Sequence, residues 1–201
     1  MTPPKTLFDL AGAKPQAACW PQAALLLIDH QLEYDVGGGL ELPDILTAKS
    51  ELARLLATAR AKNAPIIHIA HHGRAGGGLF DPNGPKSGFM AEALPSDGET
   101  VIVKGMPNAF AKTNLHDVLL KIGRKDLIVA GFMTHMCVST TVRACSEIGY
   151  LPTVVAAACA SRDLPDPCGG AIPADVVHQV ALAELSDRFA VVVKTAQEIG
   201  D

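Results

Sequence analysis

The stretch VAGFMTHMCVSTTVRA (residues 129–144) decides the fold, because it joins a branched apolar run to a helical pattern through Gly131. A thiol, Cys137, stands at this junction between a predicted strand and a predicted helix. Packing is one explanation, since free cysteine is among the most buried residue types. Reactivity is the other, because a helix N-terminus lowers the pKa of a thiol and its amide groups can hold an anion.

Near-continuous apolar runs, typical of parallel strands covered on both faces, occur along the whole chain. The clearest span residues 23–30, 65–72, 126–132 and 152–159, with shorter runs at 100–104 and 189–195. Helical patterns lie between them, at residues 42–64, 113–123, 137–149 and 173–189. Strands that alternate with helices imply right-handed crossovers. We therefore predict an α/β fold: a three-layer α/β/α domain around a mostly parallel, doubly wound sheet.

The composition is that of an ordinary globular protein, with 201 residues, 48% hydrophobic and 19% charged. This length suits one domain, so we expect residues 1–201 to form a single domain with 1–20 as an N-terminal extension. The formal net charge of −4 and the lack of any lysine and arginine cluster argue against a nucleic-acid partner. The longest apolar runs are too short to span a bilayer, so we also expect no membrane partner.

The cysteines indicate a reducing compartment. Their number, five, is odd and no CxxC pair occurs, which argues against a disulfide scaffold or a structural zinc site. The N-terminus MTPPKTLFDLAG lacks a basic segment followed by a long apolar one, so we expect no secretory signal. The sequence therefore predicts a cytoplasmic protein.

Three predicted strands end in side chains that can carry chemistry. Asp29 follows ALLLI, Lys104 ends TVIVK, and Cys137 lies beyond DLIVA. Ligands of open parallel sheets bind beyond the carboxyl ends of the strands. Asp29 could instead cap a helix, and Lys104 could be a surface lysine with a buried stem. Taken together, they predict a site in which the carboxylate accepts the thiol proton and the ammonium stabilises negative charge.

The blocks LLLIDHQ, VIVKGMPNAF and VAGFMTHMCVSTTVRACSEIGY resemble the isochorismatase-like cysteine hydrolases, the superfamily that includes nicotinamidases and N-carbamoylsarcosine amidase. The resemblance runs from about residue 23 to residue 193, nearly the whole chain. It implies that Asp29, Lys104 and Cys137 form a catalytic triad. It also implies a homodimer or homotetramer with pockets near the interfaces.

The same resemblance implies an oxyanion hole. Family members have a cis peptide bond before the residue four places ahead of the cysteine, here between Phe132 and Met133. This bond would direct the backbone amides of Met133 and Cys137 at a developing oxyanion. Such donors are often worth about 3 kcal/mol each in the transition state.

The histidines after the second strand separate this chain from nicotinamidases, which carry an aspartate and histidines there that hold a metal ion. His68, His71 and His72 occupy this region, but no Asp-any-His pair does. We expect His68 to pack inside and the other two to line the loop. The sequence therefore favours a site with no metal and no cofactor, and a metal held by the histidines near His71 is the alternative.

Several residues near the strand ends are candidates for contact with the substrate, although core packing explains Phe110 equally well. The candidates are Gln31, Tyr34, His72, Phe110 and Thr134. His135 could face solvent or a neighbouring subunit, and His178 fits a packed position on an amphipathic helix. Specificity is expected in the loops 31–42, 73–89 and 161–171, which carry no readable code.

These features predict a hydrolase that cleaves a C–N bond of a small molecule, an amide, lactam or carbamoyl group, through an acyl-enzyme at Cys137. One alternative is an isochorismatase-type reaction that releases pyruvate, for which Arg74 and Lys112 supply little positive charge. Another is a phosphatase with the spacing Cys137-x5-Arg143, which lacks loop glycines and would place Arg143 nearly opposite the thiol on a helix. A non-catalytic binding protein is the third.

Overall fold

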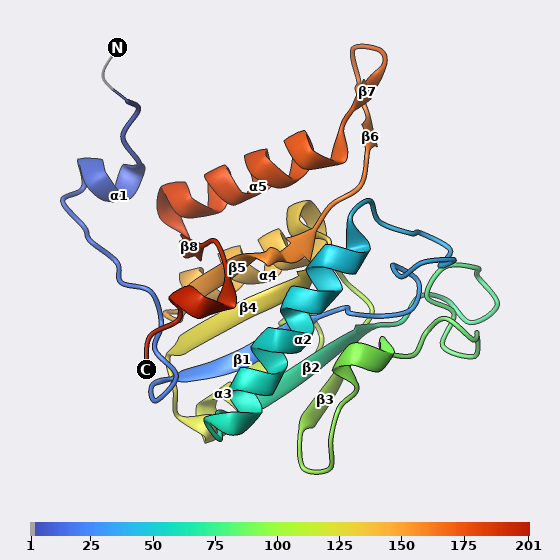
Figure 1. Cartoon of the computed structure of the whole chain (residues 1–201), viewed down its shortest axis with the longest axis horizontal. Coiled ribbons are helices and arrows are strands. Elements are labelled where there is room, and N and C mark those ends of the chain that lie inside the picture. The colour runs from blue at the N-terminus through green and yellow to red at the C-terminus, as the bar shows by residue number, and fades with distance from the viewer. Residues whose placement is uncertain (1–2) are drawn as a thin grey trace.

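The computed structural model describes residues 3–201 and has one central sheet (Figure 1). All pairings in this sheet are parallel, and the strand order is β3-β2-β1-β4-β5-β8. The predicted strands are confirmed, with small changes at their ends: β1 (Ala23–Ile28), β2 (Ile66–His71), β3 (Thr100–Lys104), β4 (Asp126–Phe132), β5 (Leu151–Ala160) and β8 (Val191–Val193).

The chain reverses its direction of winding between β1 and β4. Successive strands first add outward from β1 to β2 and β3, and the chain then returns to place β4 on the other side of β1. This arrangement confirms the doubly wound sheet. The gap between the carboxyl ends of β1 and β4 is its topological switch point, where ligands of such sheets bind. Asp29 follows β1 and Cys137 follows β4, so both lie at this point.

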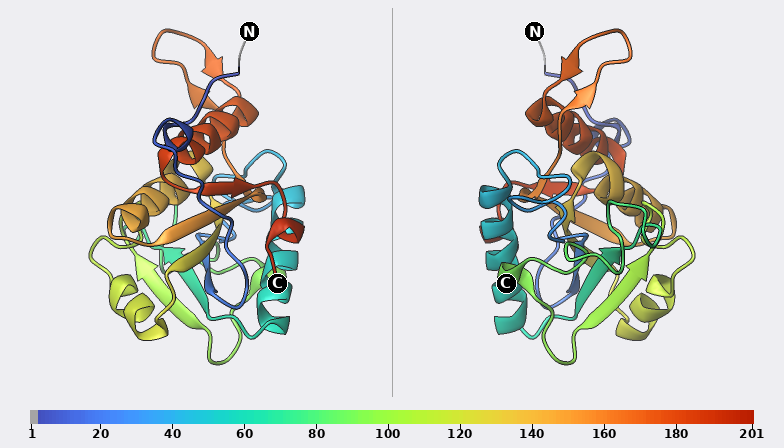
Figure 2. Two further views of the ribbon diagram at one scale, coloured as in Figure 1. Left: turned by 90° about the vertical axis from the view of Figure 1, so that its left-hand side faces the viewer. Right: turned by 90° about the vertical axis from the view of Figure 1, so that its right-hand side faces the viewer.

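Helices cover both faces of the sheet (Figure 2). Helix α2 (Ile45–Ala61) covers one face, and the helices α3 (Leu115–Ile122), α4 (Ser139–Glu147) and α5 (Ala174–Arg188) cover the other. Side chains of β1 alternate between the layers, with Leu25 and Leu27 in the cluster under α2 and Leu26 and Ile28 in the opposite one. Since every residue of β1 is buried, its run reads as continuously apolar rather than alternating.

Some elements differ from the prediction. The helix expected over residues 137–149 is α4 preceded by a π-helical turn, Thr134–Val138. A two-stranded hairpin that was not predicted, β6 (Leu164–Pro165) and β7 (Ala171–Ile172), projects from the body within the loop region expected to carry specificity (Figure 1). The remaining helices are one turn each: α1 (Leu7–Leu10), η1 (Ala91–Ala93) and η3 (Ala196–Glu198). Within residues 3–201, no helix is both long and apolar enough to cross a membrane.

Gly131, near the end of β4, allows β1 and β4 to approach closely at the switch point. Its φ is +121°, a region that side chains rarely adopt, and a Cβ atom there would overlap the carbonyl oxygen of Ile28. The register of β4 against β5 also shifts between Val129 and Gly131. Glycine at this position is therefore a structural requirement of the turn that carries Cys137.

Candidate active site

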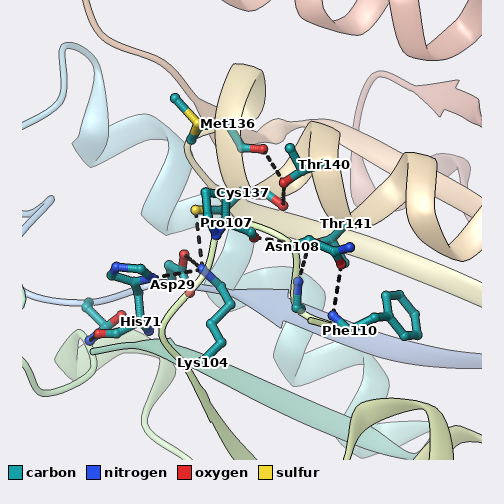
Figure 3. A network of polar contacts seen from close by, with 12 residues as sticks. Asp29, His71, Lys104, Pro107, Asn108, Phe110, Met136, Cys137, Thr140 and Thr141 are labelled. Atoms are coloured by element: carbon teal, nitrogen blue, oxygen red, sulfur yellow. Dashed lines mark hydrogen bonds and ion pairs between the residues drawn. The ribbon is translucent and has the colours of Figure 1, made fainter. Parts of the chain in front are cut away.

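Three strand ends bring a carboxylate, an ammonium and a thiol into contact (Figure 3). Asp29 Oδ2 lies 2.7 Å from Lys104 Nζ, and Lys104 Nζ lies 3.3 Å from Cys137 Sγ. All three residues are buried, with exposed fractions of 0%, 1% and 5%. The ammonium therefore bridges the carboxylate and the thiol in a site that excludes most water.

The backbone around Asp29 turns the chain off the end of β1. Asp29 has a φ of +50°, in the left-handed region that aspartate tolerates better than most residues. Its amide donates to the carbonyl oxygen of Ile69, and its own carbonyl accepts from the Gln31 amide. Its Oδ2 forms the ion pair with Lys104, and within residues 3–201 neither carboxylate oxygen has a further hydrogen-bond partner. One carboxylate oxygen is thus held by Lys104 and the other is free to accept a proton.

A fourth side chain, His71, contacts the ammonium. His71 ends β2 directly beside Lys104 in the parallel register, and its Nδ1 lies 3.2 Å from Lys104 Nζ. Because an ammonium group can only donate, His71 Nδ1 accepts and the ring proton resides on Nε2. Burial, then the charge of Lys104, lower the pKa of His71 to about 4. The imidazole is therefore neutral at physiological pH.

Burial sets the charge state of the thiol and the carboxylate. It raises the pKa of Asp29 to about 6, although the Lys104 charge and hydrogen bond oppose the rise. It also raises the pKa of Cys137 to about 12, and the nearby Asp29 charge adds to this effect. A helix N-terminus would lower the pKa of this thiol, but desolvation outweighs that effect here. At neutral pH, the site therefore pairs a protonated thiol with an ionised carboxylate.

The turn that carries Cys137 is held by side chains of α5 and of the segment after β5. The Phe132–Met133 peptide bond is cis, as the family resemblance implies. Within residues 3–201, the Met133 amide donates no hydrogen bond to another backbone group. Thr134 Oγ1 lies 2.8 Å from His178 Nδ1 on α5, and His135 Nδ1 lies 3.0 Å from the hydroxyl of Ser161 after β5. These two contacts fix the turn while leaving the Met133 amide available.

Two of the predicted substrate contacts are engaged within the protein. The Gln31 carboxamide donates to the carbonyl oxygens of His71 (3.0 Å) and Ser87 (2.6 Å) and accepts from the His71 amide (2.7 Å). The Tyr34 ring packs edge-on against Phe80 and Phe132 and is 2% exposed. Gln31 thus joins β2 to the loop before β3, and Tyr34 packs in the core against the end of β4.

The other three predicted contacts lie in different surroundings. Phe110 is half-buried and stacks on Tyr150, with ring centroids 6.2 Å apart. Thr134 is fully buried in the turn, and His72 is half-buried just beyond the end of β2. Contact of any of these residues with a substrate stays a prediction.

His68 lies inside the protein, as expected. Its Nε2 lies 2.9 Å from Glu99 Oε2, and its Nδ1 lies 3.1 Å from His30 Nε2. Within residues 3–201, no group of three or more histidine, cysteine, aspartate or glutamate side chains could hold a metal ion. With His71 engaged by Lys104 and His68 by Glu99, the residues present do not fit the nicotinamidase metal site.

Arg143 is not placed to hold a phosphate beside Cys137. It lies within α4, where its Nη2 is 3.1 Å from Glu184 Oε2 and its guanidinium stacks 4.4 Å from the centre of the Phe189 ring. A phosphate loop requires amides wrapped around the anion, whereas the residues from Ser139 onward are helical. The phosphatase alternative therefore has no geometric support.

The fold and the site define a doubly wound α/β protein with a buried thiol at its switch point, and residues 23–197 match the Isochorismatase domain. The solved structure of an isochorismatase from Pseudomonas putida KT2440 is 46% identical, with a TM-score of 0.92, and the match covers 97% of this chain and 99% of that one. The secreted isochorismatase effector Isc1 of Verticillium dahliae is 37% identical over 187 residues, 93% of this chain and 95% of that protein.

A streptothricin hydrolase of Streptomyces noursei is 30% identical over 182 residues, 90% of this chain and 71% of that protein. More distant relatives include a nicotinamidase and a ureidoacrylate amidohydrolase. The chain belongs to the isochorismatase-like hydrolase family. Because one relative is named as secreted, the cytoplasmic location stays a prediction.

Proposed function

We propose that this protein hydrolyses a C–N bond of a small molecule, an amide, lactam or carbamoyl group, through an acyl-enzyme on Cys137. The observation that carries the proposal is the contact of one buried ammonium, Lys104, with both the Asp29 carboxylate and the Cys137 sulfur. A thiol with a raised pKa is a poor nucleophile until a base removes its proton. Asp29 is the base beside it, and amidohydrolase relatives in the family support the choice of bond.

In the first half-reaction, Asp29 takes the proton of the Cys137 thiol as the sulfur attacks the carbonyl carbon. The carbonyl electrons move to oxygen, and the amides of Met133 and Cys137 donate hydrogen bonds to this oxyanion. When the oxyanion collapses, the C–N bond breaks and Asp29 returns the proton to the departing nitrogen. The amine leaves, and a thioester remains on Cys137.

In the second half-reaction, water replaces the amine. Asp29 takes a proton from the water as its oxygen attacks the thioester carbon, and the same amides hold the new oxyanion. The C–S bond then breaks, and the sulfur recovers its proton from Asp29, which regenerates the resting site. Lys104 stabilises the negative charge that passes between carboxylate and sulfur in both halves.

Activity is expected to fall in acid because Asp29 must be ionised to act as the base. Its pKa is raised to about 6, so kcat/KM should rise with pH up to about 6 and level off above it. Well below that value, the rate should drop about tenfold for each pH unit. A steady-state pH profile from 4 to 8 measures this fall in rate, the acid limb of the profile. A flat profile, or wild-type rates in Asp29→Asn, would assign the base to another group.

The reaction class is tested with a panel of amides, ureido compounds and lactams, with release of ammonia or amine as the readout. Isochorismate and p-nitrophenyl phosphate are included because pyruvate release and phosphatase chemistry are the alternatives. We expect turnover of at least one C–N substrate and none of the phosphate ester. Turnover of isochorismate alone would replace the proposal with the pyruvate-releasing reaction, and binding without turnover of any compound would replace it with a binding role.

The assembly of the protein is a separate proposal. Family resemblance implies a homodimer or homotetramer, and a small molecule rather than a nucleic acid or membrane is the proposed partner. Light scattering of the purified chain distinguishes these assemblies from a monomer.

A further inference from the structure

We propose that His71 is a positioning residue that holds the Lys104 ammonium between Asp29 and Cys137 by acting as a neutral acceptor. The inference rests on the proposed function, because the reaction needs that ammonium in one place. His71 touches Lys104 rather than the reacting atoms. Its role is to fix the direction in which the ammonium donates.

The coordination of Lys104 Nζ shows why a third acceptor is needed. A lysine ammonium has three donor hydrogens, and buried donors are almost always paired. In the described part of the chain, Nζ has three polar contacts: Asp29 Oδ2 at 2.7 Å, Cys137 Sγ at 3.3 Å and His71 Nδ1 at 3.2 Å. With Lys104 only 1% exposed, water is a poor substitute for any of them. Removal of the imidazole therefore leaves one N–H free to pull the ammonium away from the sulfur.

His71 is itself held from several directions. The Gln31 carboxamide brackets its backbone, accepting from the His71 amide at 2.7 Å and donating to its carbonyl at 3.0 Å. Its ring packs edge-on against Phe80, with centroids 5.2 Å apart and an interplanar angle of 87°. The strand register places the residue directly beside Lys104. Gln31 therefore acts on the site indirectly, because it holds the backbone of His71 in place.

A neutral acceptor suits this position better than a charged one. Burial, then the charges of Lys104 and His72, lowers the pKa of the ring and so favours its neutral form. A neutral ring orients the ammonium without offsetting its charge, so that charge acts on Asp29 and on the sulfur. A carboxylate in place of the ring would compete with Asp29 for the same cation.

The test compares two polar substitutions that differ only in where the acceptor lies. In His71→Asn, the side-chain oxygen can occupy the place of Nδ1, whereas in His71→Gln it reaches the place of Nε2, away from Lys104. We expect His71→Asn to keep kcat within about threefold of wild type. We expect His71→Gln to lose about 30-fold to 100-fold in kcat with little change in KM, because small misplacements of a reacting group cost about that much.

The pH profile separates positioning from a merely structural role. A displaced ammonium stabilises the Asp29 carboxylate less, which raises the pKa of Asp29 further. The acid limb of kcat/KM should therefore move to higher pH by about one unit in His71→Gln and stay in place in His71→Asn. If His71→Gln folds and has the kcat of the wild type, with the acid limb of kcat/KM at the same pH, the positioning role is overturned. His71→Ala serves for the same comparison where His71→Gln does not fold.

A second readout does not depend on the substrate. If Asp29 removes the thiol proton, alkylation of Cys137 by iodoacetamide also depends on the ionised Asp29. The alkylation rate, followed by mass spectrometry, should therefore fall in acid as kcat/KM does, and this acid limb should move to higher pH in His71→Gln. His116→Asn, whose ring bonds Tyr150 on another part of the protein, is the matched control and should match wild type. A shifted alkylation limb without C–N turnover would support the positioning role and contradict the proposed function. An acid limb that does not shift in His71→Gln, together with C–N turnover, would contradict the positioning role and support the proposed function.

Discussion

Replacement of Cys137 with alanine is expected to lower turnover at least about 10⁴-fold while the fold persists. Sγ is the only protein atom in the proposed mechanism that forms a bond to the substrate carbon, and no neighbouring group can replace it. The substitution removes a single buried atom and leaves one N–H of Lys104 without its acceptor, so the cost in unfolding free energy should be about 1–3 kcal/mol. Steady-state rates and denaturant unfolding of the same preparation measure both quantities.

Cys145 offers a matched control in the same segment. Its thiol is also fully buried, lies in α4 and donates to the Val142 carbonyl oxygen at 3.2 Å. Burial raises its pKa to about 12, as for Cys137, but no carboxylate or ammonium within residues 3–201 contacts it. Cys145→Ala should therefore keep wild-type turnover. Substantial turnover in Cys137→Ala, or equal loss in the two variants, would contradict a nucleophilic role for Cys137.

Gly131→Ala is expected to destabilise the fold by more than about 3 kcal/mol and to abolish the site geometry in whatever remains folded. The new Cβ would overlap the Ile28 carbonyl oxygen, and the φ of +121° is itself unfavourable for alanine. Relief requires the ends of β1 and β4 to separate. Asp29 follows one of these strands and Cys137 the other, so stability and activity should fall together.

A control substitution, Gly98→Ala, distinguishes the steric overlap of a Cβ atom from the strain of a positive φ. Gly98 also has a positive φ, +87°, but a Cβ there meets nothing within 4 Å. Gly98→Ala should cost only the backbone strain, about 1–3 kcal/mol, and leave activity unchanged. Unfolding free energies in denaturant compare the two variants. Equal losses would show that the close approach of β1 and β4 tolerates a side chain.

The sheet and the meeting of its strand ends could be predicted from the sequence. β1 is buried on both faces, which leaves a continuous apolar run typical of a central parallel strand. Parallel strands end at the same edge, so Asp29 and Cys137 had to lie near each other once β1 and β4 were neighbours. Lys104 followed from the same rule, although β3 lies two strands away from β1.

The environment of each group could not be predicted in the same way. Sequence position suggested a lowered pKa for Cys137, but the depth of burial decides its direction. His71 was visible only as a strand-end histidine; its pairing with Lys104 depends on the register of β2 against β3. His71 and Lys104 each end an apolar run, and this shared position was the sequence signal that could have identified the contact. Gln31 turned inward to support it because backbone groups there needed partners.

A covalent thioester on Cys137 is the most direct consequence of the proposed mechanism. The best amide substrate releases an acid, and the p-nitrophenyl ester of that acid is the probe. This ester should acylate the enzyme faster than water removes the acyl group, so the intermediate accumulates. Acid quenching followed by peptide mass spectrometry should then find the acyl mass on the peptide that carries Cys137 and on no peptide of Cys137→Ala. Ester turnover at the wild-type rate in Cys137→Ala, with no adduct at Cys137 in the wild type, would contradict the account.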